Sequence, residues 1–180
     1  MSTDVVRVGI LGCGNVGAAL VQLIEEHAAE IVRRSGLRLE VTRVAVRNLA
    51  RPRAVELPEG VLTHDPQAVV DDPEVDVVVE VIGGIEPARS LILSALAQGK
   101  PVVTANKELL ANVGRDVFEA AEAAGLDLLF EASVAGGIPL IRPLRESLAG
   151  ERITRVMGIV NGTTNFILTQ MTEERSEEHT

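Results

Sequence analysis

The sequence predicts an α/β fold, a Rossmann-like doubly wound parallel sheet. A glycine-rich turn joins the first apolar segment to a helix-like segment, and short apolar segments then alternate with helix-like ones. The 180 residues are 46% hydrophobic but only 2% aromatic, so the apolar content is mostly Val, Leu, Ile and Ala. Such branched aliphatic residues are typical of parallel strands that helices cover on both faces.

The expected elements follow from periodicity and from capping residues. Apolar residues recur at helical spacing over 15–34, and Gly36 can end that helix. Asp65 can cap a short helix that has Pro66 at its first position. The segment V-D-V-V-V-E-V-I at 75–82 is almost continuously apolar, as expected of a central buried strand. We expect strands at 5–11, 38–46, 75–82, 101–104 and 126–130, helices at 15–34, 65–70, 87–98 and 108–124 with an interruption near 112–114, and a loop with a short helical turn at 48–55.

The first turn, within V-R-V-G-I-L-G-C-G-N-V-G at 6–17, has the dinucleotide-binding fingerprint in its required context. Gly12 permits the tight turn, Gly14 lets a pyrophosphate approach the backbone, and Gly17 lets the helix pack closely on the strand. A plain strand-to-helix turn would not need all three glycines. Cys13 is better explained as a small filler than as a nucleophile. The expected cofactor-binding residues here are Gly12, Cys13, Gly14, Asn15, Val16 and Gly17.

Composition and charge exclude several classes of partner. The net charge of −9 argues against binding of nucleic acid or of an anionic membrane. No apolar run is long enough for a spanning helix, and the polar start M-S-T-D is not a signal peptide. The single cysteine excludes internal disulfides and favours a reducing compartment. We therefore expect a cytoplasmic enzyme domain that acts on a small molecule.

Ligands of doubly wound sheets lie outside the carboxyl ends of the strands, so the strand ends are the next place to examine. The second strand ends in Arg47, with Arg51 and Arg53 just beyond, where an NAD site usually has an acidic residue. Glu40 is at the wrong end of this strand. Arg47 could pair with a 2′-phosphate, which favours NADP over NAD. The alternative is that these arginines form a solvated surface cluster.

Three later strand ends also carry candidate residues. Gly83 and Gly84 would let a flat cofactor lie against the backbone, although a plain turn explains them nearly as well. Lys107 follows the next strand and could bind a carboxylate or an oxyanion as a compact charge. The segment 131–139 turns through Gly-Gly-Ile-Pro, and its backbone carbonyls could hold a cation or shape a pocket.

Five motifs, in this order and spacing, resemble homoserine dehydrogenase. They are G-I-L-G-C-G-N-V-G, V-V-E-V-I-G-G, T-A-N-K-E-L-L-A, E-A-S-V-A-G-G-I-P and G-I-V-N-G-T-T-N-F-I-L, and the resemblance covers residues 5–174. It implies NAD(P)-dependent interconversion of L-homoserine and L-aspartate 4-semialdehyde, in the aspartate route to threonine and methionine. It also implies a homodimer or homotetramer for the full-length enzyme.

The resemblance assigns roles to residues as well. It places Gly12 to Gly17 at the pyrophosphate and Arg47 near the 2′-phosphate. It places Lys107 at the nicotinamide and substrate. It further implies cofactor contacts at Gly83, Gly84 and Gly162, and a sodium ion on the backbone carbonyls of Glu131, Val134, Gly136 and Ile138.

The same resemblance divides the chain. Residues 1–150 would form the NAD(P)-binding domain, and residues 151–174 the first strand and helix of an α+β catalytic domain. The substrate-binding Glu and Asp and the proton-donor Lys of the family belong to a later segment, so no catalytic residue is assigned here. We expect 175–180 to be a non-native tail on a truncated frame, because R-S-E-E-H-T can be read from a translated sequencing adapter. This chain would then only bind cofactor.

Two alternatives stay open. One is another NAD(P)-dependent amino-acid or semialdehyde oxidoreductase, although a thioester mechanism needs a cysteine beyond the glycine turn and the chain has none. The other is a non-catalytic dinucleotide-binding module, which would not need the segment N-G-T-T-N-F that follows residue 150.

Overall fold

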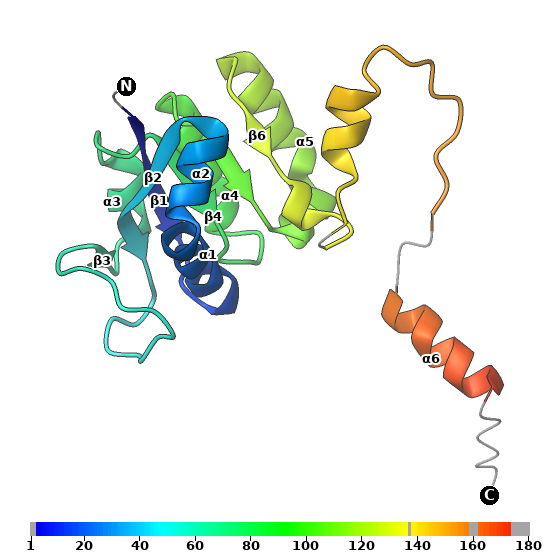
Figure 1. The fold of residues 1–180 in the computed structure, drawn as a ribbon, viewed down its shortest axis with the longest axis horizontal. Helices are drawn as coiled ribbons and strands as arrows, with labels where there is room; N and C mark the ends of the chain where they lie inside the picture. The colour runs from blue at the N-terminus through cyan, green and yellow to red at the C-terminus, as the bar shows by residue number, and fades with distance from the viewer. Residues whose placement is uncertain (1–2, 137, 159–161, 174–180) are drawn as a thin grey trace, which may run out of the picture. The chain divides into compact units, whose positions relative to one another are not determined.

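The computed structural model describes residues 3–136, 138–158 and 162–173. The chain divides into two compact units, Met1–Ile141 and Arg142–Thr180. The elements, drawn in Figure 1, are β1 (Asp4–Leu11), α1 (Asn15–Glu26), α2 (Ala28–Ser35), β2 (Leu37–Ala45), β3 (Leu62–Thr63), α3 (Pro66–Asp71), β4 (Val77–Glu80), α4 (Ala88–Ala97), β5 (Val102–Thr104), α5 (Lys107–Ala124), β6 (Leu128–Leu129), the short helices η1 (Glu131–Ser133) and η2 (Pro143–Ser147), and α6 (Gly162–Glu173).

The first unit is built on one parallel sheet of six strands in the order β3-β2-β1-β4-β5-β6. The chain starts in the middle of the sheet, adds β2 and β3 on one side, and then crosses back to add β4, β5 and β6 on the other. This reversal beside β1 is the switch point of a doubly wound fold. The predicted fold class is confirmed.

Alternation along the strands sends apolar side chains to both faces of the sheet. Ile10 and Leu11 are both fully buried but belong to different core clusters. Ile10 packs in the cluster that contains Val21 of α1, whereas Leu11 packs in the cluster built by α3, α4 and α5. Burial of each such side chain stabilises the fold by about 1.5–3 kcal/mol. The two core clusters therefore hold the helices on both faces of the sheet.

The capping predictions are confirmed. The Asp65 carboxylate accepts hydrogen bonds from the backbone N–H of Gln67 at 2.9 Å and of Ala68 at 3.3 Å, and Pro66 begins α3. Gly36 follows α2 with φ = 75°, a left-handed conformation that favours glycine. The interruption expected in the helix at 108–124 is a single non-helical residue, Val113, within α5.

Some boundaries differ from the prediction. The helix expected at 15–34 is two helices that meet at His27, and the apolar periodicity continues across the break, so the pattern did not reveal it. The strand expected at 75–82 spans only Val77–Glu80, because Val75 donates its N–H to Asp72 in a turn. Sequence analysis missed β3, which has two residues and owes its pairing to β2. The loop 48–55 contains turns but no helix.

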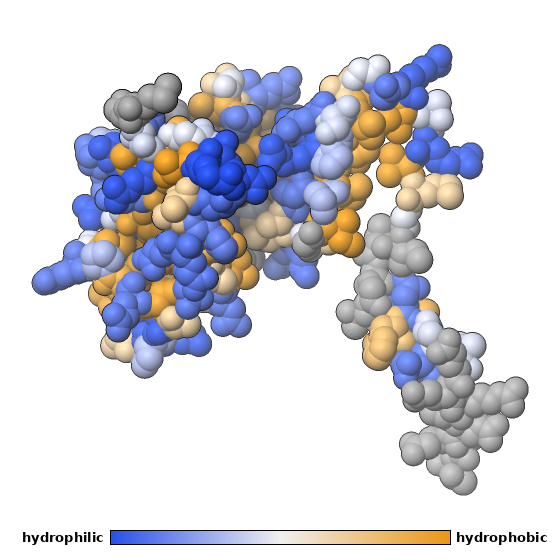
Figure 2. Space-filling view, viewed as in Figure 1, coloured by the Kyte–Doolittle hydropathy of each residue, from blue (hydrophilic) through white to orange (hydrophobic). Residues whose placement is uncertain are grey.

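The second unit contains η2 and α6 among its described residues. The expected helix spans Gly162–Glu173, and the described residues 152–158 before it contain no strand. Several large apolar side chains of this unit are at least half exposed: Val156, Met157, Phe166, Ile167, Leu168 and Met171. Figure 2 shows that hydrophobic residues reach the surface in the described part of this unit.

The domain limits proposed from the sequence remain predictions. The compact units separate after Ile141, whereas the sequence placed the boundary at 150. The expected tail at 175–180 lies outside the described residues. None of the helices in the described ranges combines the length and the hydropathy that a membrane crossing requires.

Candidate cofactor site

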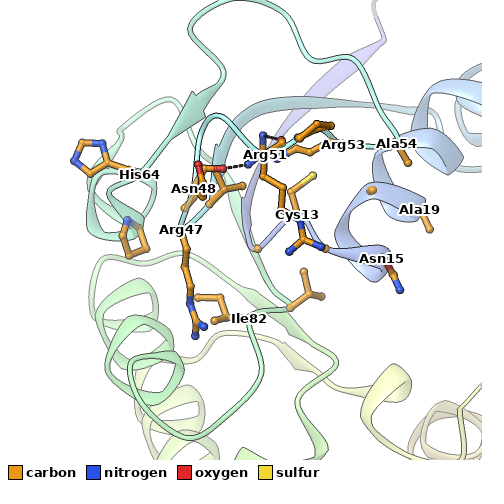
Figure 3. Close-up of a pocket in the computed structure, with 18 of the residues that line it drawn as sticks. Cys13, Asn15, Ala19, Arg47, Asn48, Arg51, Arg53, Ala54, His64 and Ile82 are labelled. Carbon is orange, nitrogen blue, oxygen red and sulfur yellow. Dashed lines mark hydrogen bonds between the residues drawn. The ribbon is translucent and has the colours of Figure 1, made fainter.

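A cavity of about 590 Å³ lies at the carboxyl ends of β1 and β2, beside the switch point. Its size is that of a typical small-molecule site. Figure 3 shows Cys13 of the glycine turn and Asn15 at the start of α1 on one side of the cavity, and Arg47 and Asn48 from the loop after β2 on the other. Five of the predicted cofactor-binding residues line it: Gly12, Cys13, Gly14, Asn15 and Arg47.

The three glycines of the first turn have different physical roles. Gly12 has φ = 105°, and a Cβ there would lie 2.8 Å from the carbonyl oxygen of Val81. A Cβ on Gly17 would collide with the carbonyl oxygen of Gly12. A Cβ on Gly14 would meet no heavy atom within 4 Å. Gly12 and Gly17 are therefore required by packing, whereas Gly14 leaves open space on the cavity side of the turn.

Helix α1 begins at this turn. Gly14 is its N-cap residue and supplies no side chain, and the first turn of α1 has no acidic residue. The N–H groups at a helix start have no helical acceptor and lie at the positive end of the helix dipole. The start of α1 thus leaves these donors to an anion in the cavity.

The residues 47–53 after β2 form what we call the arginine loop. Its conformation is held by Arg53, whose guanidinium donates to the carbonyl oxygens of Asn48, of Leu49 at 3.2 Å and of Arg51 at 2.9 Å. Arg47 is exposed and lines the cavity, as does Arg51 (Figure 3). One arginine therefore organises the loop, and two others place positive charge at the cavity.

Cys13 is partly buried in the cavity wall. Burial raises the pKa of its thiol above the usual value, although the positive charge of Arg53 acts in the opposite direction. A thiol that stays protonated is a poor nucleophile. This agrees with Cys13 as a small filler of the turn.

The ends of β4 and β5 carry a buried polar cluster that sequence analysis missed. We call Glu80, Thr104 and Asn106 the Glu80 network. The Glu80 side chain is fully buried and accepts a hydrogen bond from the Thr104 hydroxyl at 2.7 Å. The Asn106 amide donates to Glu80 at 3.5 Å and to the carbonyl oxygen of Gly84 at 2.7 Å. The sequence signal for this cluster is Glu80 itself, an acidic residue at the end of a Val-rich strand. A buried acid needs hydrogen-bond partners, so its presence predicts polar residues nearby.

The other predicted site residues lie outside the cavity lining. Gly83 and Gly84 follow β4 with φ of 80° and 74°, and Lys107 is the exposed first residue of α5. Gly162 belongs to the second unit. The cofactor and substrate contacts expected of these residues remain predictions.

The expected sodium site involves η1 and the turn after it. The Glu131 carbonyl accepts from the N–H of Val134 at 3.1 Å, and the Glu131 carboxylate accepts from the N–H groups of Leu140 and Ile141. Gly136 and Ile138 lie in the following turn and are exposed. Within the described part of the chain, no group of three His, Cys, Asp or Glu side chains could hold a metal ion. Carbonyl ligation of sodium remains a prediction.

Residues 12–131 match the family model described as "Homoserine dehydrogenase, NAD binding domain". The chain belongs to the homoserine dehydrogenase family. Residues 139–180 match a second model described as "Homoserine dehydrogenase". The resemblance inferred from the five motifs is confirmed, and the cavity with its glycine turn lies within the part that the first model describes.

Named homoserine dehydrogenases align with nearly all of this chain. The Bacillus subtilis (strain 168) enzyme is 49% identical over 95% of the chain and 40% of its own length, and the Corynebacterium glutamicum enzyme is 52% identical over 92% of the chain and 37% of its own length. The solved homoserine dehydrogenase of Thiobacillus denitrificans is 51% identical with a TM-score of 0.86, over 95% of this chain and 39% of that one. This chain spans about 40% of the length of such curated relatives.

One solved relative carries a cofactor. It is a hyperthermophilic archaeal homoserine dehydrogenase in complex with NADPH, 31% identical with a TM-score of 0.77, and the match covers 94% of this chain and 57% of that chain. A family model for NAD binding and this NADPH complex both support a nicotinamide dinucleotide as the cofactor of the family.

Proposed function

We propose that this chain is the NADP(H)-binding part of an enzyme that interconverts L-homoserine and L-aspartate 4-semialdehyde. The observation that carries the proposal is the cavity, which the glycine turn and Arg47 line from opposite sides. Family membership supports the substrate pair. We further propose a cytoplasmic enzyme that assembles as a homodimer or homotetramer.

The cavity fits a dinucleotide phosphate. The backbone at Gly14 and the free N–H groups at the start of α1 would bind the pyrophosphate. Arg47 would bind the 2′-phosphate through its planar fork of donors, with Arg51 adding positive charge. No acidic side chain lines the cavity among the described residues, so no carboxylate there would accept from a ribose 2′-hydroxyl. This composition favours NADP over NAD.

The cofactor would supply hydride transfer at C4 of its nicotinamide ring. Lys107 would bind the substrate as a compact positive charge, and the carbonyl oxygens of Glu131, Val134, Gly136 and Ile138 would hold a sodium ion. The proton donor is expected in the later family segment. We therefore expect this chain to bind cofactor and to oxidise no measurable homoserine.

The proposal is tested by titrating the chain with NADPH and following its fluorescence. Gly14→Ala places a methyl group in open space, so the fold should persist while NADPH affinity falls by about tenfold or more. Gly150→Ala is the matched control, because a Cβ there also meets open space and residue 150 does not line the cavity. Equal NADPH affinity in the two variants would show that NADPH does not bind in this cavity.

A further inference from the structure

The two halves of a doubly wound sheet bind the two halves of a dinucleotide across the switch point. The arginine loop lies at the end of β2, so the half with the 2′-phosphate belongs over β1–β3. The nicotinamide half then belongs at the carboxyl ends of β4 and β5. Those ends are Glu80 and Thr104, the first two members of the Glu80 network.

The network ties together three chain segments at that edge. The Glu80 carboxylate accepts from the backbone N–H of Ile82 at 2.8 Å and of Gly83 at 3.3 Å, which fixes the loop after β4. It also accepts from Thr104, whose hydroxyl in turn accepts from the N–H of Asn106 at 3.0 Å. The Ser133 hydroxyl of η1 donates to the Thr104 carbonyl at 2.8 Å.

Asn106 carries the connection onward to α5. Its side-chain oxygen accepts from the N–H of Leu109 at 3.1 Å and so caps the helix, while its side-chain N–H₂ bonds Gly84. Lys107 is the next residue and the first of α5. The buried carboxylate thus bonds the loop at Gly83 directly, and it is linked to Gly84 and the start of α5 through Asn106.

We propose that Glu80 is a positioning residue that holds the nicotinamide-facing loops, 82–84 and 105–107, in their binding conformation. The two side-chain oxygens of Glu80 accept from four donors, whereas the amide of a glutamine offers one acceptor oxygen. Glu80 is fully buried behind these loops, so it acts on the cofactor through their backbone rather than by contact. The inference rests on the proposed cofactor-binding function.

The test compares two ligands on the whole chain. NADPH has both halves, whereas adenosine 2′,5′-bisphosphate has only the half assigned to β1–β3. We expect Glu80→Gln to weaken NADPH binding by about tenfold, the scale of one or two lost hydrogen bonds, and to leave the bisphosphate affinity within about twofold. Thr104→Val, which removes the bridging hydroxyl, should give the same pattern with a smaller loss of about threefold.

Lys100→Met is the matched control for general damage. Lys100 is also buried and its ammonium donates to the carbonyls of Val70 and Asp72, but it lies at the other end of β5. This variant should lower the unfolding temperature and leave the ratio of the two affinities unchanged. If Glu80→Gln lowers both affinities together, or neither, the positioning role is overturned. If the unchanged chain binds neither ligand, the proposed function fails first.

Amide hydrogen exchange on the unchanged chain gives a measurement that needs no variant. NADPH should slow exchange at 82–84 and 105–107, because these loops would face the nicotinamide half. Adenosine 2′,5′-bisphosphate should slow exchange only around 12–18 and the arginine loop. Equal protection of 82–84 by both ligands would contradict the inference even if no variant folds.

Discussion

The two halves of the sheet end their strands in opposite ways. At the ends of β1 and β2 the chain leaves space: Gly14 has open space where a Cβ would lie, and an exposed arginine loop lines a cavity. At the ends of β4 and β5 the residues fill space with a buried carboxylate, a hydroxyl and an amide that bond one another. The first half thus keeps donors free for a ligand, whereas the second half uses its polar groups to fix its own backbone. One edge of the sheet thus carries two kinds of strand end.

The largest expected effect comes from adding a methyl group where α1 packs closely against the glycine turn of the first half. Gly17→Ala forces a methyl group against the backbone carbonyl of Gly12, which cannot move like a flexible side chain. We expect a loss of about 3 kcal/mol in the free energy of unfolding, or about 6–12 °C in Tm. Thermal unfolding followed by circular dichroism measures it. A variant as stable as Gly14→Ala would show that the close approach of α1 to the turn is not needed.

The second effect comes from removing a side chain that the other half requires. Asn106→Ala deletes the cap of α5 and leaves the carbonyl of Gly84 and the N–H of Leu109 without this partner. We expect a loss of about 2 kcal/mol in the free energy of unfolding, measured in urea. Asn112→Ala is the control, since Asn112 is an exposed residue of the same helix that bonds only a local carbonyl. Similar losses in the two variants would count against a special role for the network.

A smaller effect is expected from removing one positive charge from the cavity in the first half. Arg47→Ala removes an exposed guanidinium from the cavity and should leave the fold intact. We expect NADPH affinity to fall by about tenfold while NADH affinity changes by less than about twofold. Calorimetric titration with both nucleotides provides the ratio. An equal loss for both would place Arg47 at the pyrophosphate, and no loss for either would place it outside the site.

The smallest effect concerns the crossover between the halves. Asp72 follows α3 and its carboxylate accepts from the N–H of Glu74 at 2.9 Å and from Arg43 of β2 at 2.7 Å. The Glu74 hydrogen bond first, and then Arg43, hold the pKa of Asp72 below its usual value of 3.8. A carboxyl pKa lowered by folding contributes stability above the unfolded-state pKa, and this contribution is lost as the pH falls through the folded-state pKa.

Asp72→Asn keeps an acceptor for Glu74 but removes the charge that faces Arg43. We expect the variant to be less stable than the unchanged chain by at most about 1 kcal/mol at pH 7, with the difference shrinking as the pH falls below about 4. Urea unfolding at pH 7 and pH 3 measures both differences. A stability difference that grows as the pH falls would contradict a folded-state pKa of Asp72 below its usual value.

The same contrast explains what the sequence could predict. The glycine turn is local: its three glycines, the strand before it and the helix after it are contiguous, so one pattern specified the fold class and one wall of the cavity. The Glu80 network joins Glu80 to Thr104 and Asn106, which follow it by 24 and 26 positions in the sequence. No single segment of the sequence therefore shows the network. The short strand β3 escaped notice for the same reason, because its two residues are a strand only beside Val44 and Ala45.

Glu80 also has a consequence before the fold is complete. During synthesis its partners Thr104 and Asn106 appear only after a further 24 and 26 residues. Until then the carboxylate stays hydrated at the end of the run Val77–Val79, with Asp76 at the other end. Charges that flank a short β-prone apolar run oppose its pairing with other chains. We therefore expect the carboxylate that is buried in the folded sheet to oppose aggregation of this segment before the sheet has formed.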